Sequence, residues 1–340
     1  MSKMKVAQVT EPGRDFDIVE RDIPEPGEKQ VRIKVEACGI CHGDSDIKEG
    51  HLPFGIEYPR VLGHEVVGYI DKVGDPVMAW KKGQRVGVGW QGGLCLQCDP
   101  CRTGDFANCL NPQITGLTYD GGFGEYMIAY QEGLAKVPDE FTGIEAAPLL
   151  CAGITTYNSL RHAGAHAGDL VAVLGIGGLG HLAVQYSNKL GFNTVAIARG
   201  KESEKLAMEL GAHHYIDSNE TDPANSLKEL GGAKVILATA PSSKAISKMI
   251  DGLGVNGKLV LIAFTPDPIE FLPAQLLIGK KSIIGWYSGH AKDSEDALEF
   301  SKLAGIRPMV ETFPLESVNE AYERMFHGKP KFRVVLQMGK

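Results

Sequence analysis

The sequence lacks several features that would place the protein in a special class. No hydrophobic run approaches the roughly 18 residues of a transmembrane helix, which argues against a membrane-spanning segment. Its 35 Lys and Arg residues are outnumbered by 42 Asp and Glu, and the net charge of −7 argues against nucleic acid as a main partner. No apolar segment of a signal peptide follows the first residues, so we expect a cytoplasmic protein. Internal repeats and low-complexity tails are also missing, which excludes a solenoid.

The seven cysteines are unevenly spread along the chain. Because we see no export signal, we expect metal ligands or reactive thiols rather than disulfides. The cysteines are Cys38, Cys41, Cys95, Cys98, Cys101, Cys109 and Cys151.

With 340 residues the chain is long enough for two domains. Its first part shows short strand-like runs separated by glycine and proline, which is typical of a small barrel or irregular sandwich. From about residue 143 a helical stretch leads into alternating strands and helices, which predicts a doubly wound parallel sheet. The expected strands are residues 5–10, 16–21, 30–37, 66–73, 85–89, 123–129, 170–174, 194–198, 214–217, 234–238, 258–264, 281–286 and 332–338. The expected helices are residues 144–162, 181–190, 201–210, 223–230, 243–251 and 292–304.

A glycine-rich turn near the middle of the chain indicates dinucleotide binding. It follows the apolar run 170–174 and precedes a helical pattern, the context that a G-x-G-x-x-G motif requires. Gly175 allows the tight turn, Gly177 lets a pyrophosphate approach the backbone, and Gly180 lets the helix pack on the strand. The helix N-terminus adds N–H groups and a partial positive charge. The residues expected at the cofactor here are Gly175, Gly177, Gly178, Leu179 and Gly180.

Four closely spaced cysteines, Cys95, Cys98, Cys101 and Cys109, predict a metal site within one loop. Thiolates separated by two, two and seven residues can complete a tetrahedral shell around zinc. Such a shell leaves no open position, so its role is expected to be structural. An iron–sulfur cluster and unligated thiols are the alternatives.

A second candidate site centres on His64, which is followed by Glu65 in Gly63-His-Glu-Val-Val-Gly68. Two further candidate ligands, Cys41 and Cys151, lie far away in glycine-flanked segments. Spacing alone does not assemble three such residues, so the residues by themselves leave this site open.

Together these motifs resemble the zinc-containing alcohol dehydrogenases of the medium-chain dehydrogenase/reductase superfamily. Gly63-His-Glu-x2-Gly68-x5-Gly74-x2-Val77 matches the signature of that family, and the match runs along the whole chain. The resemblance implies an α/β protein in which a GroES-like, β-rich catalytic domain, residues 1–148 and 290–340, is interrupted by a Rossmann domain, residues 149–289. It also implies two zinc ions per subunit, a catalytic one on Cys41, His64 and Cys151 and a structural one on Cys95, Cys98, Cys101 and Cys109.

The resemblance further implies a mechanism. The open fourth position of a zinc ion held by two cysteines and one histidine takes an alcohol or carbonyl oxygen, and hydride passes to or from the nicotinamide. Glu65 is expected beside the metal or as an occasional ligand, and Asp44 is expected on the second nitrogen of His64, a solvated turn carboxylate being the alternative. The other implied contacts are His42 to the pyrophosphate, Thr155 with Thr156 to the nicotinamide, and Trp90 to the substrate, unless Trp90 is a core residue.

One departure from the family pattern concerns proton transfer. Members usually carry Ser or Thr two residues after the first zinc cysteine, and often His five residues after it, as a relay to solvent. Here these positions are Gly43 and Asp46. A water chain helped by Ser45, Asp46 or His51 is a possible substitute. Some relatives without the hydroxyl reduce a conjugated C=C bond instead, which keeps that reaction open.

A second departure concerns cofactor choice. In NAD-selective members an acid at the end of the second Rossmann strand bonds the ribose 2′-OH. Here the strand ends Ala198-Arg-Gly-Lys201, without an acid, and Arg199 and Lys201 can pair with a 2′-phosphate. We expect NADP(H) to be preferred over NAD(H), the alternative being a basic pair that opens a solvated helix.

The sequence thus predicts a zinc-dependent, NADP(H)-linked alcohol dehydrogenase or aldehyde reductase. One alternative is a zinc-containing medium-chain reductase acting on a conjugated C=C bond or an imine, which Gly43 favours. Another is a nucleotide-binding protein without turnover, which the presence of Cys41, His64 and Cys151 disfavours. The expected partner is a small-molecule alcohol or aldehyde, with no nucleic acid and no membrane. The resemblance also implies a homodimer or homotetramer joined near residues 281–288.

Overall fold

The computed structural model describes residues 2–52, 55–265, 267–327 and 332–339. The chain divides into two units, which we call unit 1 (Met1–Ile154 with Ser288–Lys340) and unit 2 (Thr155–Tyr287). Met1 and Lys340, the outer limits of the predicted first domain, lie outside the described residues. The limits at residues 148/149 and 289/290 stay a prediction about where the domains fold independently.

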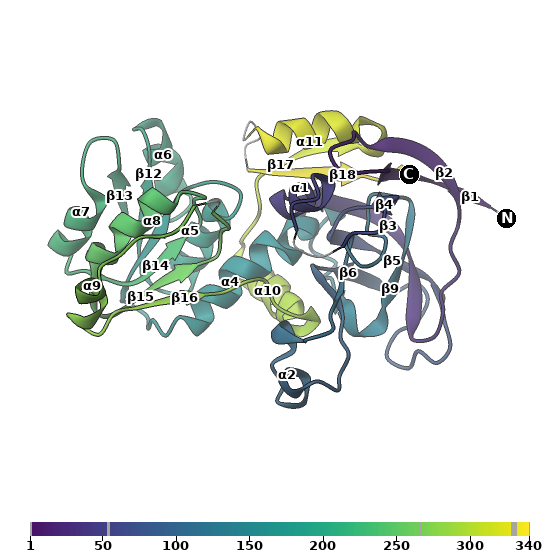
Figure 1. Ribbon diagram of the computed structural model, residues 1–340, viewed down its shortest axis with the longest axis horizontal. Coiled ribbons are helices and arrows are strands. Elements are labelled where there is room, and N and C mark those ends of the chain that lie inside the picture. The colour runs from purple at the N-terminus through teal and green to yellow at the C-terminus, as the bar shows by residue number, and fades with distance from the viewer. Residues whose placement is uncertain (1, 53–54, 266, 328–331, 340) are drawn as a thin grey trace. The chain divides into compact units, whose positions relative to one another are not determined.

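Unit 1 is built around β-sheets (Figure 1). Its strands are β1 (Lys3–Val9), β2 (Asp17–Asp22), β3 (Gln30–Ile40), β4 (Arg60–Val61), β5 (Glu65–Val73), β6 (Arg85–Val88), β7 (Gln91–Gly93), β8 (Gln113–Ile114), β9 (Tyr126–Tyr130), β10 (Leu134–Lys136), β17 (Val310–Pro314) and β18 (Arg333–Gln337). The main sheet has the order β10-β6-β5-β3-β18-β17, with β9 also paired to β3. Along β3, buried Val31, Ile33 and Val35 alternate with more exposed residues, as expected of a strand with one face on the core. The C-terminal strand β18 pairs antiparallel with β3.

The helices of unit 1 are short except for α10, which has 14 residues. They are α1 (His42–Lys48), α2 (Asp99–Arg102), α3 (Gly143–Ala146), α10 (Ala291–Ala304) and α11 (Val318–Phe326), and α4 (Ala152–His162) runs from unit 1 into unit 2. The single helix expected over residues 144–162 is wrong. After α3 the chain forms a 3-10 turn (Ala147–Leu150), and Cys151 then leaves the helical conformation with φ −129° before α4 begins.

Unit 2 is a parallel sheet flanked by helices (Figure 1). Its strands are β11 (Leu170–Leu174), β12 (Asn193–Ala198), β13 (His214–Asp217), β14 (Ala233–Ala238), β15 (Leu253–Leu261) and β16 (Ser282–Gly285), and its helices are α5 (Gly180–Lys189), α6 (Glu202–Glu209), α7 (Pro223–Glu229), α8 (Ser243–Met249) and α9 (Pro273–Leu277). The order β13-β12-β11-β14-β15-β16 confirms the doubly wound sheet. β15 begins at Leu253, earlier than expected. The first part of this strand was not predicted, because Asn256, at a φ of 56°, interrupts the apolar pattern. Among the described residues, no helix has the length and apolar character needed to cross a membrane.

Candidate functional site

Four side chains from three distant segments of the sequence come together in unit 1. Cys41 precedes α1, His64 precedes β5, Glu65 is its first residue, and Cys151 lies between the 3-10 turn and α4. One potential ligand atom from each lies within 4.8 Å of the others, and the two sulfur atoms are 3.8 Å apart. The structure therefore brings together the residues that the resemblance assigns to a catalytic metal. We call these four residues the cysteine–histidine cluster.

Asp44 orients the ring of His64. It lies in the first turn of α1, is fully buried, and places Oδ1 at 3.1 Å from Nδ1 of His64. The same carboxylate accepts hydrogen bonds from the backbone N–H groups of Cys41 (2.9 Å) and Gly63 (3.1 Å). An Nδ1–H that donates to a carboxylate leaves the lone pair of Nε2 available for a metal ion. Because Asp44 is buried, its interpretation as a solvated turn carboxylate is wrong.

The carboxylate of Glu65 is buried with one oxygen paired and the other unpaired. Oε1 contacts Nη2 of Arg333, a buried residue at the start of β18. Oε2 has no hydrogen-bond partner among the described residues. Burial raises the pKa of Glu65 to about 7, although the charge of Arg333 acts in the opposite direction. Sequence reasoning missed Arg333; the available signal was a charged residue at the head of an apolar strand.

Arg333→Met is expected to lower the free energy of unfolding by about 3 kcal/mol, because the buried Glu65 loses its partner. Urea unfolding measures the loss. The matched control is Arg324→Met, which breaks the pair with Glu311. That arginine side chain is 40% exposed, so the control should cost at most about 1 kcal/mol. Equal losses in the two variants would contradict a special role for the buried pair.

The donor set of the cysteine–histidine cluster fits a zinc ion. Two thiols and one imidazole are a ligand set of catalytic zinc that leaves a fourth position open. A hydrogen bond with Cys151, helped by His64 and opposed by burial, lowers the pKa of the Cys41 thiol well below its ordinary value, which favours the thiolate. The unpaired oxygen of Glu65 is a buried polar atom that a nearby cation would compensate.

Trp90 and Gly43 lie beside this cluster. The rings of Trp90 and His64 meet edge to face, with centroids 4.9 Å apart and an interplanar angle of 89°. A Cβ atom at Gly43 would lie 3.3 Å from each of these two rings. Trp90 is half-buried and also packs against the core of unit 1. The position where relatives carry the relay hydroxyl is thus bordered by two aromatic rings.

The second predicted cluster, Cys95, Cys98, Cys101 and Cys109, lies in the loop around α2. Its four sulfur atoms lie within 4.8 Å of one another, and those of Cys95 and Cys109 are 3.5 Å apart. The backbone N–H of Leu110 donates to Cys98 at 3.5 Å. Backbone hydrogen bonds lower the pKa of Cys95 to about 6, whereas burial raises that of Cys101 to about 12. Four converging sulfur atoms fit a closed, structural zinc site.

In unit 2 the predicted glycine turn joins β11 to α5. Gly175 has a φ of 97°, and a Cβ at Gly180 would lie 1.9 Å from the carbonyl oxygen of Gly175, so both positions require glycine. Nothing lies within 4 Å of the corresponding Cβ position at Gly177. Leu179, at the N-terminus of α5, provides no side-chain cap. The turn therefore leaves room at a helix N-terminus, where an anion is stabilised.

The remaining residues expected at the cofactor lie in both units. Arg199 and Lys201 follow β12 in unit 2, and both are exposed. Thr155 is buried in α4, and His42 is exposed at the start of α1 in unit 1. Their contacts with a cofactor stay predictions.

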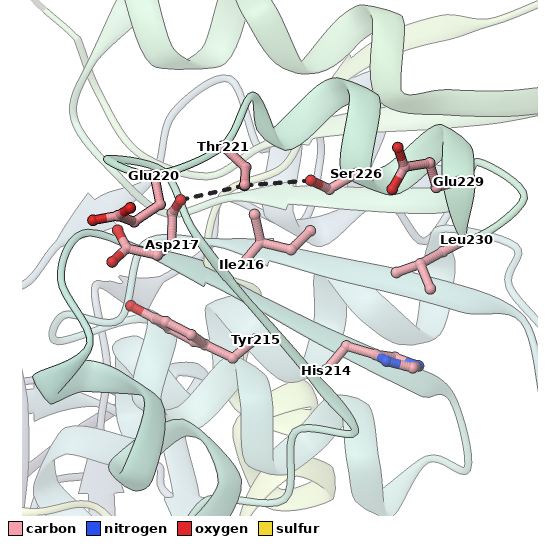
Figure 2. Close-up of a pocket in the computed structure, with 9 residues that line it drawn as sticks. All are labelled: His214, Tyr215, Ile216, Asp217, Glu220, Thr221, Ser226, Glu229 and Leu230. Carbon is pink, nitrogen blue, oxygen red and sulfur yellow. Dashed lines mark hydrogen bonds between the residues drawn. The ribbon is translucent and has the colours of Figure 1, made fainter.

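A surface hollow of about 340 Å³ lies along the edge strand β13 of unit 2 (Figure 2). Its lining is acidic and includes Asp217, Glu220 and Glu229, and none of the predicted site residues borders it. An acidic lining disfavours a phosphate group bound inside this hollow. Two lining residues, Tyr215 and Asp217, hydrogen-bond to the backbone of Gly200 and were missed by sequence reasoning.

Two parts of the chain match known domain families. Residues 27–139 match the alcohol dehydrogenase GroES-like domain, and residues 178–303 match the zinc-binding dehydrogenase domain. The alcohol dehydrogenase patD of Penicillium expansum is 43% identical over 338 residues, which cover 99% of this chain and 98% of that protein.

Solved structures of similar proteins share the fold. CAD from Helicobacter pylori, complexed with NADP(H), is 26% identical with a TM-score of 0.87 over 98% of each chain. The alcohol dehydrogenase rspB from E. coli CFT073, complexed with NADH, is 28% identical with a TM-score of 0.89, covering 99% of this chain and 100% of that one. These matches confirm the predicted GroES-like and Rossmann architecture. The chain belongs to the zinc-containing alcohol dehydrogenase family of medium-chain dehydrogenases/reductases and is an oxidoreductase of the alcohol dehydrogenase/reductase type.

Proposed function

We propose that the protein is a zinc-dependent, NADP(H)-linked alcohol dehydrogenase or aldehyde reductase, which transfers hydride between nicotinamide and the carbon of an alcohol or carbonyl substrate. The observation that carries this proposal is the convergence of Cys41, His64 and Cys151, with His64 oriented by Asp44. We infer a catalytic zinc ion at this cluster and a structural one in the loop around α2.

In the proposed reaction the residues of unit 1 hold and orient the reacting groups. Cys41, His64 and Cys151 would hold a zinc ion, which would supply a Lewis acid for an alcohol or carbonyl oxygen, and a bound nicotinamide would supply the hydride chemistry. Asp44 keeps the Nε2 lone pair of His64 available to the metal. Arg333 balances the charge of the buried Glu65.

The proton needs another path, because Gly43 has no hydroxyl. Asp46 is half-buried on α1, and burial raises its pKa while the charges of His51 and His42 act in the opposite direction. The backbone N–H of His51 donates to the carbonyl oxygen of Asp46 at 2.9 Å, which keeps the two residues together. We infer that Asp46 and His51, rather than the buried Ser45, pass the proton to water.

Gly43→Ser is expected to raise kcat/KM for alcohol oxidation by roughly tenfold, because it restores a hydroxyl for proton transfer. The gain is held down by the tight contact of the new Cβ with Trp90 and His64. The matched control is Gly43→Ala, which adds the same Cβ without the hydroxyl and should bring no gain. Equal rates in the serine and alanine variants would mean that the missing hydroxyl is not limiting.

The proposed preference for NADP(H) rests on the turn after β12. Arg199 and Lys201 are exposed there, and no acidic side chain ends the strand. The similar proteins from H. pylori and E. coli CFT073 are complexed with NADP(H) and NADH respectively. Family likeness therefore does not decide between NADP(H) and NADH, and the proposed preference depends on the charges of this turn.

Arg199→Asp is expected to shift the ratio of kcat/KM values for NADPH and NADH toward NADH on the order of 100-fold, because a phosphate partner becomes a repelling charge. Initial rates with each cofactor measure the ratio. Lys205→Asp is the control, because this substitution makes the same change of charge at an exposed position of α6. An unchanged ratio in Arg199→Asp would refute the contact between Arg199 and the phosphate.

Gly43 also favours a second candidate function, the reduction of a conjugated C=C bond or an imine. Cinnamaldehyde offers both a carbonyl and a conjugated C=C bond, so incubation with NADPH that carries two deuterium atoms at C4 separates the proposals. We expect deuterium on the carbinol carbon, detected by NMR and mass spectrometry. Deuterium on the β-carbon of a saturated aldehyde would replace the proposal by that of a conjugate reductase.

We also propose that subunits join as a homodimer or homotetramer through β16. This strand is the last in the sheet order of unit 2, so one of its edges has no partner within the described sheet. The exposed fractions of Leu277 and Ile278, at the end of α9 just before β16, are 77% and 75%, and that of Val255 in β15 is 72%. Apolar side chains next to a free strand edge are typical of a subunit interface. Light scattering coupled to size-exclusion chromatography would give the number of subunits.

A further inference from the structure

Both polar backbone groups of Gly200 are held by side chains of the neighbouring strand β13. The N–H of Gly200 donates to Oδ1 of Asp217 at 2.9 Å, and its carbonyl oxygen accepts a hydrogen bond from the Tyr215 hydroxyl at 2.6 Å. Residues two apart on a strand share a face, and Figure 2 shows both side chains pointing the same way from β13. We call these two hydrogen bonds the Gly200 clamp.

The Gly200 clamp lies between two exposed cations. Arg199 and Lys201 flank Gly200, and the side chain of Arg199 makes no hydrogen bond or ion pair within the part of the chain that the structure describes. Gly200 itself has a φ of 84°. Glycine loses more conformational freedom on ordering than any other residue, so without the clamp this turn would carry its cations in many orientations.

We propose that Tyr215 and Asp217 are positioning residues, which hold the turn so that Arg199 and Lys201 meet the 2′-phosphate of NADP(H) together. The inference rests on the proposed preference for NADP(H). A turn that is fixed before binding removes an ordering cost from the binding step. Both residues act through the backbone of Gly200 and not through contact with the phosphate.

Because Asp217 is charged, the direction in which its removal changes the affinity for the phosphate tests the proposal. Hydrogen bonds from the backbone of Asn219 and Gly200, together with the charge of Lys201, lower the pKa of Asp217, so the carboxylate is ionised at neutral pH. A negative charge near a phosphate weakens phosphate binding, and its removal alone would strengthen binding. If Asp217 matters as a clamp, its removal has the opposite effect.

The experiment measures two ligands that differ only in the 2′-phosphate, adenosine 2′,5′-bisphosphate and adenosine 5′-monophosphate, by calorimetry on the full chain. Tyr215→Phe and Asp217→Ala each remove one hydrogen bond of the Gly200 clamp. We expect both variants to bind the bisphosphate roughly threefold to tenfold more weakly, with the affinity for the monophosphate unchanged. Asp217→Asn loses the charge but keeps a carbonyl oxygen that accepts from Gly200, so it should recover most of the bisphosphate affinity.

The control is Glu220→Gln, which removes a charge from the same hollow without a contact to Gly200. It should leave the bisphosphate affinity unchanged or slightly higher, and Arg199→Ala should abolish the preference for the bisphosphate. In one outcome, Arg199→Ala abolishes the preference while Tyr215→Phe and Asp217→Ala bind both ligands as the unmodified chain does. In that case the positioning role of the Gly200 clamp is refuted and the NADP(H) proposal stands. If the unmodified chain binds the bisphosphate and the monophosphate equally, the positioning role of the clamp and the NADP(H) proposal are both refuted. Parallel losses for both ligands, with a lower melting temperature, would reduce the two residues to a structural role and overturn the inference.

Discussion

Turnover is expected to fall on the order of 1,000-fold or more when Cys41 or His64 is replaced by alanine, because each substitution removes a ligand of a Lewis acid worth several kcal/mol. The affinity for NADP(H) should stay close to that of the unmodified protein, since the glycine turn belongs to unit 2. Steady-state kinetics, zinc content and fluorescence titration with NADPH measure the three quantities.

Cys38→Ala is the matched control for Cys41→Ala. Cys38 is buried in β3, three residues earlier, and burial raises the pKa of its thiol well above the ordinary value, so it stays neutral. We expect this variant to keep zinc and turnover, with only a modest loss of stability. Full turnover in Cys41→Ala or His64→Ala would show that the reaction does not depend on this cluster. An equal loss of turnover in Cys38→Ala would show that such substitutions act by disturbing the fold.

The loop around α2 is where we expect the largest loss of thermal stability. Cys98→Ala should lower the melting temperature by about 10 °C, because a structural zinc ion contributes folding free energy directly. The loop has little hydrophobic burial of its own: the exposed fractions of Leu96 and Leu110 are 53% and 70%. Convergence of the four sulfur atoms is therefore the main feature that organises it. Differential scanning fluorimetry and metal analysis of the purified variant give the melting temperature and the zinc content.

Arg102→Ala, an exposed position in α2, is the control for Cys98→Ala and should leave both quantities unchanged. Loss of one zinc ion with an unchanged melting temperature would make this metal dispensable for stability. Iron and sulfide in the purified protein would establish the iron–sulfur alternative instead. Zinc retained in Cys98→Ala would contradict the assignment of Cys98 as a ligand.

The local sequence pattern was enough to predict those parts of the protein that are built from residues close together in the chain. The glycine turn follows from one strand–turn–helix segment, and the strand over residues 170–174 was predicted with the bounds of β11. The four cysteines around α2 lie within one loop, so their spacing alone predicted their convergence. The alternation of strands and helices predicted the parallel sheet of unit 2 because each element there packs against a neighbour close in the chain.

Long-range contacts could not be predicted in this way. The convergence of Cys41, His64 and Cys151 came from the family resemblance, because no periodicity relates them. Arg333 was missed since its partner Glu65 is 268 residues away in the sequence. The break before Cys151 had a local signal that was overlooked, because Pro148, the second residue of the 3-10 turn, is strongly disfavoured inside a helix.

The pairing of β18 with β3 has a consequence for synthesis of the protein. A ribosome that has just made Glu65 must add 268 residues before it reaches Arg333, which takes roughly 15 to 50 s at ordinary elongation rates. During that interval β3 lacks its later neighbour, and the nascent chain carries an open strand edge of the kind that associates with other chains. The parallel sheet of unit 2 emerges in full meanwhile. The order of emergence from the ribosome therefore makes every strand of unit 2 available before β18 and leaves Glu65 without its partner Arg333 until that last strand arrives.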